Sequence, residues 1–150
     1  MAETSDAPPL STSRKVLCGV YAAIAVVALI ATWSQNLAYQ NSAQDFFSSF
    51  LRDTTVTSAS RSITADIVLF FLTASILMVI EGRKHGVRLI WAYIVGGIFI
   101  AISVTFPLFL IAREMRLNTS DAGNLDPKDT TLLVVLAVLL LGTTIWVTTG

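Results

Sequence analysis

Residues 89–112 read LIWAYIVGGIFIAISVTFPLFLIA, a run that contains no charged side chain. A transmembrane α-helix needs about 20 mostly apolar residues to cross the hydrocarbon core of a bilayer, so this run is long enough to span. Further apolar runs cover residues 16–33, 63–80 and 131–147, and Asp66 is the one charged residue within them. The sequence therefore predicts an all-α membrane protein, built as a small multi-pass bundle of four transmembrane helices.

The composition of the chain supports this prediction. Charged residues make up 13% of the 150 residues, about half the share of roughly 25% found in soluble domains. Lys plus Arg and Asp plus Glu number 10 each, so no net charge favours nucleic-acid binding. A single Cys and a single His exclude an internal disulfide, a Cys/His zinc site and bis-His haem ligation. We therefore expect neither a soluble enzyme nor a metal or cofactor.

Three parts follow along the chain. Residues 1–13 are polar and are expected to form a disordered tail. Residues 14–117 are predicted to form a three-span membrane unit, and residues 118–150 an outer loop with the fourth span. A signal peptide is the alternative for residues 16–33. That run is longer than the roughly 7–15 residues of a usual signal-peptide core and lacks a good cleavage site after it, so a retained helix is favoured.

The longest connection, residues 34–62, contains a pattern of its own. Phe46, Phe47, Phe50 and Leu51 recur at a spacing that places them on one face of a helix. One interpretation is a short helix that lies in the membrane interface. The other is a loop that caps the bundle with its aromatic side chains, and the sequence does not separate the two.

Charge bias gives the expected orientation. Four crossings place both termini on one side, and a cytoplasmic N-terminus then leaves five basic residues on each side. The inner five are Arg14, Lys15, Arg83, Lys84 and Arg88, and the outer five are Arg52, Arg61, Arg113, Arg116 and Lys128. Because the first helix usually dominates and basic residues directly precede it, both termini are predicted to be cytoplasmic, in a bacterial inner membrane.

Asp66 is the first candidate for a functional residue. A carboxylate inside a span costs several kcal/mol unless it is paired or hydrated, which makes it a functional candidate by default. A structural role is the alternative, because Ser62 is a plausible N-cap and Asp66 would then favour the positive end of the helix dipole.

A possible polar site surrounds it. Pro107 cannot donate to the Ser103 carbonyl, which leaves a free acceptor and a kink at about the depth of Asp66. Arg113 and Glu114 end the third span on the same side, although helical register disfavours a pair between Arg113 and Asp66. The candidate site therefore comprises Asp66, Ser103, Pro107, Arg113 and Glu114, and a single structural water would explain it equally well.

Two helical stripes pass through this site. They consist of Asp66, Phe70, Thr73 and Leu77, and of Tyr93, Gly96, Ile100, Ser103 and Pro107. Such stripes are typical of helix–helix seams, although a substrate path would use the same faces. The motif Gly82-x-x-x-Gly86 lies in a polar turn and is expected to have no packing role. Anionic lipid head groups are the expected contacts of the inner basic residues, Arg14, Lys15, Arg83, Lys84 and Arg88.

Several segments together resemble a known family. They are Trp33-x-x-Asn36, Ala65-Asp66-Ile67, the turn from Glu81 to Arg88 with Trp91, and residues 103–114, SVTFPLFLIARE. Their order resembles the small bacterial membrane proteins catalogued as domain of unknown function 2834, over about residues 16–117. The resemblance implies a compact three-span unit and no known activity. The fourth span is an addition to that pattern.

Three functions fit the sequence. The first is a non-enzymatic accessory or structural protein that binds a membrane partner or lipid, because no catalytic constellation is visible. The second is an oligomeric transporter or channel subunit for an ion or small solute, which would use the polar site around Asp66 and Pro107. The third is a membrane enzyme that uses Asp66 and Glu114 as a carboxylate pair.

Overall fold

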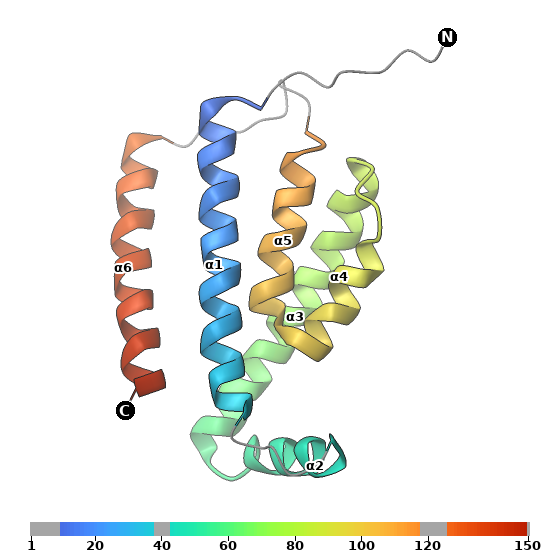
Figure 1. Ribbon diagram of the computed structural model, residues 1–150, viewed down its shortest axis with the longest axis vertical. Coiled ribbons are helices and arrows are strands. Elements are labelled where there is room, and N and C mark those ends of the chain that lie inside the picture. Colours follow the sequence, from blue (N-terminus) through green and yellow to red (C-terminus); the bar gives the residue numbers. More distant parts are fainter. Residues whose placement is uncertain (1–9, 38–42, 118–125, 150) are drawn as a thin grey trace.

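The computed structural model describes residues 10–37, 43–117 and 126–149 (Figure 1). Within these residues every regular element is helical, and the side chains of residues 43–47 are not described. The elements in chain order are α1 (Thr12–Asn36), α2 (Ala43–Asp53), α3 (Ser58–Lys84), α4 (Ile90–Gly96), the π-helix η2 (Gly97–Ala101), α5 (Ile102–Glu114) and α6 (Pro127–Thr149). The expected tail, residues 1–13, lies mostly outside the described residues.

Four helical segments are long and apolar enough to cross a membrane. They are Thr12–Asn36, Ser58–Lys84, Ile90–Glu114 and Pro127–Thr149, with mean hydropathies between 2.3 and 2.5. The prediction of an all-α, multi-pass membrane protein with four such segments is confirmed. The path of the third segment, however, differs from a single straight helix.

The third segment folds back on itself. The ring centroids of Tyr93 and Phe109 lie 5.9 Å apart, whereas a straight helix would separate these residues by about 24 Å. Ala101, the last residue of η2, has an extended backbone with φ 172° and ψ 142°, and α5 begins directly after it. As Figure 1 shows, α4 and η2 run into the bundle and α5 returns beside them. Residues 90–114 therefore form a helical hairpin whose two ends lie at the same end of the bundle.

The hairpin reaches about halfway along α3. A Cβ atom added to Gly97, at its turn, would lie 2.6 Å from Cε2 of Phe71, and Phe71 is near the midpoint of the apolar run 63–80. The α5 helix, at 13 residues, is about 20 Å long, which is short of the roughly 30 Å hydrocarbon core. Each arm of the hairpin is therefore shorter than that core, although the segment Ile90–Glu114 as a whole is long and apolar enough to span it.

Pro107 lies within a continuous helix. The α5 helix continues through Pro107, since only the one hydrogen bond to the Ser103 carbonyl is lost there. The chain instead reverses at Ala101, beside two glycines that let the hairpin arms approach. A Cβ atom on Gly96 would lie 3.2 Å from Cγ2 of Thr105, on the opposite arm.

The hairpin also changes where the chain ends. The side-chain amide of Gln35 donates to the Thr148 carbonyl at 3.4 Å, so α1 and α6 run parallel and end together. The N-terminal end of α1 and the C-terminal end of α6 consequently lie at opposite ends of the bundle (Figure 1). This arrangement differs from the four complete crossings on which the prediction of a shared side for both termini was based, because the third segment returns to the end of the bundle where it starts (Figure 1).

The core gathers around α5. Phe109 of α5 and Met78 of α3 are fully buried. A Cβ atom on Gly82 would lie 2.7 Å from Cδ1 of Ile90 and 3.2 Å from Cε2 of Phe109. Gly82 therefore has the close packing role that was not expected of it, because the hairpin brings α4 and α5 against the last turns of α3.

Gly86 follows the C-cap of α3 and has a left-handed backbone conformation. Its φ of +65° is readily adopted by glycine. The Val87 amide donates to the Gly82 carbonyl at 2.8 Å, which completes the hydrogen bond of a Schellman helix end. The chain then turns directly into α4.

The packed face of α3 differs from the expected stripe. Ala74, Met78 and Gly82 are buried, whereas all four predicted residues, Asp66, Phe70, Thr73 and Leu77, are exposed. The buried residues Ala74 and Met78 each follow a predicted residue, Thr73 or Leu77, by one position. The buried face is therefore rotated by about 100° around the helix axis from the predicted one. The predicted stripe in the third segment is divided by the reversal at Ala101, which leaves Ser103 and Ile100 exposed.

The remaining elements lie outside the core. In Figure 1, α2 lies across one end of the bundle. The helical interpretation of this segment is confirmed, while the side chains of Phe46 and Phe47 lie outside the described residues. The α6 helix contains no buried residue, and among the described elements its main contact is α1.

Candidate functional site

Arg113 and Glu81 form the closest ion pair in the described part of the chain. Both Nε and Nη2 of Arg113 contact Oε2 of Glu81, at 2.7 and 2.6 Å. Nη1 of the same guanidinium lies 3.3 Å from Oε1 of Glu114. The pair exists because the hairpin returns the last turn of α5 to the level of the last turn of α3.

Arg14 joins α1 to this pair. Its Nε lies 3.4 Å from Oε2 of Glu114, and these two side chains are only 11% and 9% exposed. Its guanidinium also donates to the backbone carbonyls of Glu114 and, at 3.1 Å, Leu117. Arginine is a favourable partner for the free carbonyls and negative dipole at a helix C-terminus, so Arg14 fixes the end of α5 against α1.

His85 completes the group. Its Nε2 lies 3.4 Å from Oε2 of Glu81, and the His85 side chain is 7% exposed. Four residues from three helices and His85, the C-cap of α3, thus form one connected set. We call it the charged cluster: Arg14, Glu81, His85, Arg113 and Glu114.

The charged cluster links helices to one another through ion pairs. Arginine remains protonated in proteins and has no acceptor, and each of the two carboxylates faces at least one arginine. The described residues contain no group of three His, Cys, Asp or Glu side chains suited to a metal ion. What the cluster does is hold α1, α3 and α5 together at one end, because stranding one of its charges would be costly.

The predicted polar site is divided between distant places. Asp66 lies fifteen residues before Glu81 on the same helix, which is about 22 Å. Arg113, held at Glu81, is therefore out of reach of Asp66. Pro107 is buried in the core, whereas Asp66 and Ser103 are exposed. Of the five candidates, only Arg113 and Glu114 come together.

The sequence reasoning missed Glu81 and His85 and gave Arg14 the wrong role. Arg14 was expected to contact lipid, but its guanidinium is turned inward to α5. The other expected lipid contacts, Lys15, Arg83, Lys84 and Arg88, have exposed side chains. In the sequence, acidic residues stand next to basic ones at the ends of two spans. This pattern could have indicated ion pairs between those ends.

The hairpin redistributes the basic residues. Eight of the ten Lys and Arg residues now lie at the end that carries the charged cluster: Arg14, Lys15, Arg83, Lys84, Arg88, Arg113, Arg116 and Lys128. The other two, Arg52 and Arg61, lie at the α2 end. The five-to-five tie of a four-crossing chain becomes a strong asymmetry of eight to two.

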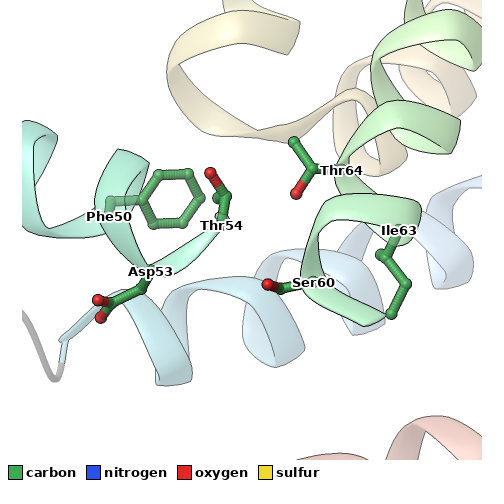
Figure 2. Close-up of a pocket in the computed structure, with 6 residues that line it drawn as sticks. All are labelled: Phe50, Asp53, Thr54, Ser60, Ile63 and Thr64. Atoms are coloured by element: carbon green, nitrogen blue, oxygen red, sulfur yellow. The ribbon is translucent and has the colours of Figure 1, made fainter. Parts of the chain in front are cut away.

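A pocket lies at the α2 end. It has a volume of about 290 Å³ and lies between the end of α2 and the first turns of α3 (Figure 2). We call it the elbow pocket, and its lining residues are Phe50, Asp53, Thr54, Ser60, Ile63 and Thr64.

Comparison with known proteins identifies the family. A family of proteins of unknown function, DUF2834, matches residues 20–115. The chain belongs to the DUF2834 family. The DUF2834 match includes the whole hairpin and four residues of the charged cluster, but it excludes Arg14 and α6. No curated protein and no solved structure matches the chain.

Proposed function

We propose that this DUF2834 protein is a non-enzymatic accessory protein in a membrane. We further propose that α6 is the surface with which it binds a membrane-protein partner. The observation that carries the proposal is the contrast between α6 and the rest of the bundle. Its Leu- and Val-rich surface has no buried residue, and one hydrogen bond, from Gln35 to Thr148, joins its end to α1. The α6 helix therefore keeps its apolar surface available to another chain.

The state of the charged groups supports a role without catalysis. In the charged cluster each arginine is paired with at least one carboxylate. General acid–base catalysis needs a group that can reach a substrate proton, and these groups already bind each other between helices.

The proposal includes an orientation. Basic residues near the ends of spans favour the cytoplasmic side, so the eight-to-two asymmetry supports a cytoplasmic N-terminus and a C-terminus on the opposite side. Tryptophan, which prefers the membrane interface, is consistent with this placement. Trp33 and Trp146 lie near the adjacent ends of α1 and α6, and Trp91 begins the hairpin at the other end.

Site-specific photo-crosslinking in native membranes tests the partner role. We expect a photoreactive residue at Leu136 or Leu139, which are 49% and 63% exposed, to give a discrete protein adduct. The matched control is Ile76 on α3, which is 54% exposed and should give none. The absence of protein adducts from both α6 positions would contradict the proposal.

A transporter or channel subunit is the second candidate, and the hairpin favours it. Re-entrant and discontinuous helices that end near the bilayer midplane are typical of channels and transporters. Asp66 and Pro107 do not form the site first expected for it. Ion or solute flux in liposomes that is lost in Asp66→Asn would favour this candidate over the accessory role.

A further inference from the structure

The connection from α3 to α4 presents basic and apolar side chains together. It lies at the end of the bundle opposite α2 (Figure 1). Arg83, Lys84 and Arg88 are exposed, and none of the three has an ion pair with another described residue. Leu89 and Trp91 are 77% and 62% exposed. We call these five residues the basic turn.

The acidic side chains of the charged cluster do not neutralise the basic turn. Those of Glu81 and Glu114 are only 19% and 9% exposed, and they are paired with Arg113 and Arg14. Their charges cancel within the cluster, so the exposed surface of the turn stays positive. A group of basic residues next to a membrane span attracts anionic lipid head groups.

Leu89 has a backbone conformation that leucine rarely adopts. Its φ of 59° and ψ of 35° are left-handed, which is unfavourable for a residue with a Cβ atom. Such strain persists where the surrounding structure imposes it, and it is frequent at ligand contacts. The Leu89 side chain is mostly exposed and contributes little to the core, so its apolar surface is available to a group outside the chain.

Neighbouring contacts fix this conformation. Val87 is buried in the core, and its amide donates to the Gly82 carbonyl at 2.8 Å. The Ala92 amide donates to the Leu89 carbonyl, also at 2.8 Å. Arg88 and Leu89 are therefore held on a fixed backbone, which lowers the entropy lost when a ligand binds.

The depth of the basic turn matches the boundary between head groups and acyl chains. The apolar run 89–112 begins at Leu89, directly after Arg88. Trp91 follows two residues later, and tryptophan prefers this boundary. An acidic protein would complement the charges, but it would leave unexplained why Leu89 and Trp91 lie beside them at the start of a span.

We propose that the basic turn binds an anionic phospholipid. The phosphate lies among Arg83, Lys84 and Arg88, while Leu89 and Trp91 contact the glycerol and the first acyl carbons. The contacts that the sequence predicts for these basic residues are thereby assigned to one rigid turn with an apolar component. This site is independent of the partner surface on α6.

Native mass spectrometry of the full chain in detergent, with defined lipids added, tests the site. We expect phosphatidylglycerol to be retained more strongly than phosphatidylcholine with the same acyl chains. Arg88→Gln should weaken the retention of phosphatidylglycerol about fivefold, as for one basic residue near a charged surface. The control Arg52→Gln removes an exposed arginine at the α2 end, where Asp53 is its partner, and should change nothing.

Leu89→Asn separates lipid binding from folding. Asparagine adopts the left-handed conformation more readily than leucine, so the melting temperature in lipid-free detergent should equal or exceed that of the wild type. Retention of phosphatidylglycerol should fall about threefold, because an apolar contact is lost. A lower melting temperature with unchanged retention would assign Leu89 to the fold and overturn the proposal.

Two further results would overturn it. One is equal retention of phosphatidylglycerol and phosphatidylcholine, or equal effects of Arg88→Gln and Arg52→Gln. The other comes from a photoreactive residue at Leu89 in native membranes, which should give lipid adducts. A discrete protein adduct there would assign the turn to a protein partner instead. Because no α6 residue is changed, failure here leaves the proposed role of α6 standing.

Discussion

The α5 and α6 helices have nearly the same hydropathy and opposite surroundings. The segment that contains α5 has a mean hydropathy of 2.5 and a third of its apolar window is buried, whereas α6 has 2.3 with none buried. Burial therefore does not follow from apolar character in this protein. Because lipid tails are as apolar as leucine, association between helices in a membrane depends on close packing and polar contacts.

The two helices differ in these respects. The hairpin places glycines where the neighbouring chain approaches closely, and α5 ends in Arg113 and Glu114 of the charged cluster. In α6, Gly142 has nothing within 4 Å, and no charge lies in its last turn. Small residues at contacts and charges at helix ends, rather than hydropathy, distinguish the core helix from the peripheral one.

The largest expected effect is all or none and concerns the side on which each helix ends. In a Cys18→Ser background, single cysteines replace Ser11, Val56, Asp126 and Thr149. In intact cells an impermeant maleimide should label positions 56 and 149 and leave 11 and 126 unlabelled, because α5 returns to its starting side and α6 then crosses. Labelling at 126 with protection at 149 would restore four complete crossings.

Leucine substitutions at glycines test the packing difference directly. Gly97→Leu forces a side chain into the ring of Phe71 and should lower the free energy of unfolding in detergent by about 3 kcal/mol. Gly142→Leu in α6 meets nothing and should be neutral or slightly stabilising. Chemical denaturation followed by circular dichroism measures both. Similar losses for the two variants would contradict the proposed contrast.

A double-mutant cycle tests the charged cluster. Arg113→Gln leaves Glu81 without its main partner in a largely buried place, so we expect a loss of about 2 kcal/mol. Arg113→Gln combined with Glu81→Gln should lose less than the sum of the single variants. Asp66→Asn should be close to neutral and additive with Arg113→Gln, since about 22 Å of α3 separates the two sites. Strong coupling between Asp66 and Arg113 would show that the hairpin is wrong.

The sequence was sufficient for the membrane class and insufficient for the path of the chain. The length and hydropathy of residues 89–112 predict a helix that can span a membrane. A helical hairpin made of the same residues has the same length and hydropathy, so these two quantities do not distinguish the two structures. The reversal depends on contacts that are distant in sequence, such as Gly97 with Phe71 and Gly82 with Ile90. No local pattern separates those contacts from the small residues of an ordinary helix–helix seam.

The candidate site shows the same limit. Arg113 and Glu114 were identified as polar groups at a span end, but their partner was sought in Asp66, on the side that a full crossing would reach. The reversal moves both residues to Glu81 and Arg14 instead. The even division of basic residues in the four-crossing arrangement was an available warning, since membrane proteins usually have a clear bias.

The smallest expected effect on stability is that of removing α6. A chain that stops after Lys128 loses a helix with no buried residue, so the free energy of unfolding of the remaining bundle should change by less than about 0.5 kcal/mol, as for other changes away from packed contacts. The charged cluster lies in α1, α5, and α3 with its C-cap residue His85, and should keep those helices inserted. Chemical denaturation of the truncated and full-length chains in the same detergent measures the difference. Loss of a cooperative transition in the truncated chain would place α6 in the core and remove the contrast with α5. If stability holds while the partner that crosslinks to Leu136 no longer co-purifies, α6 acts as the binding surface and α5 as the support that holds the bundle together.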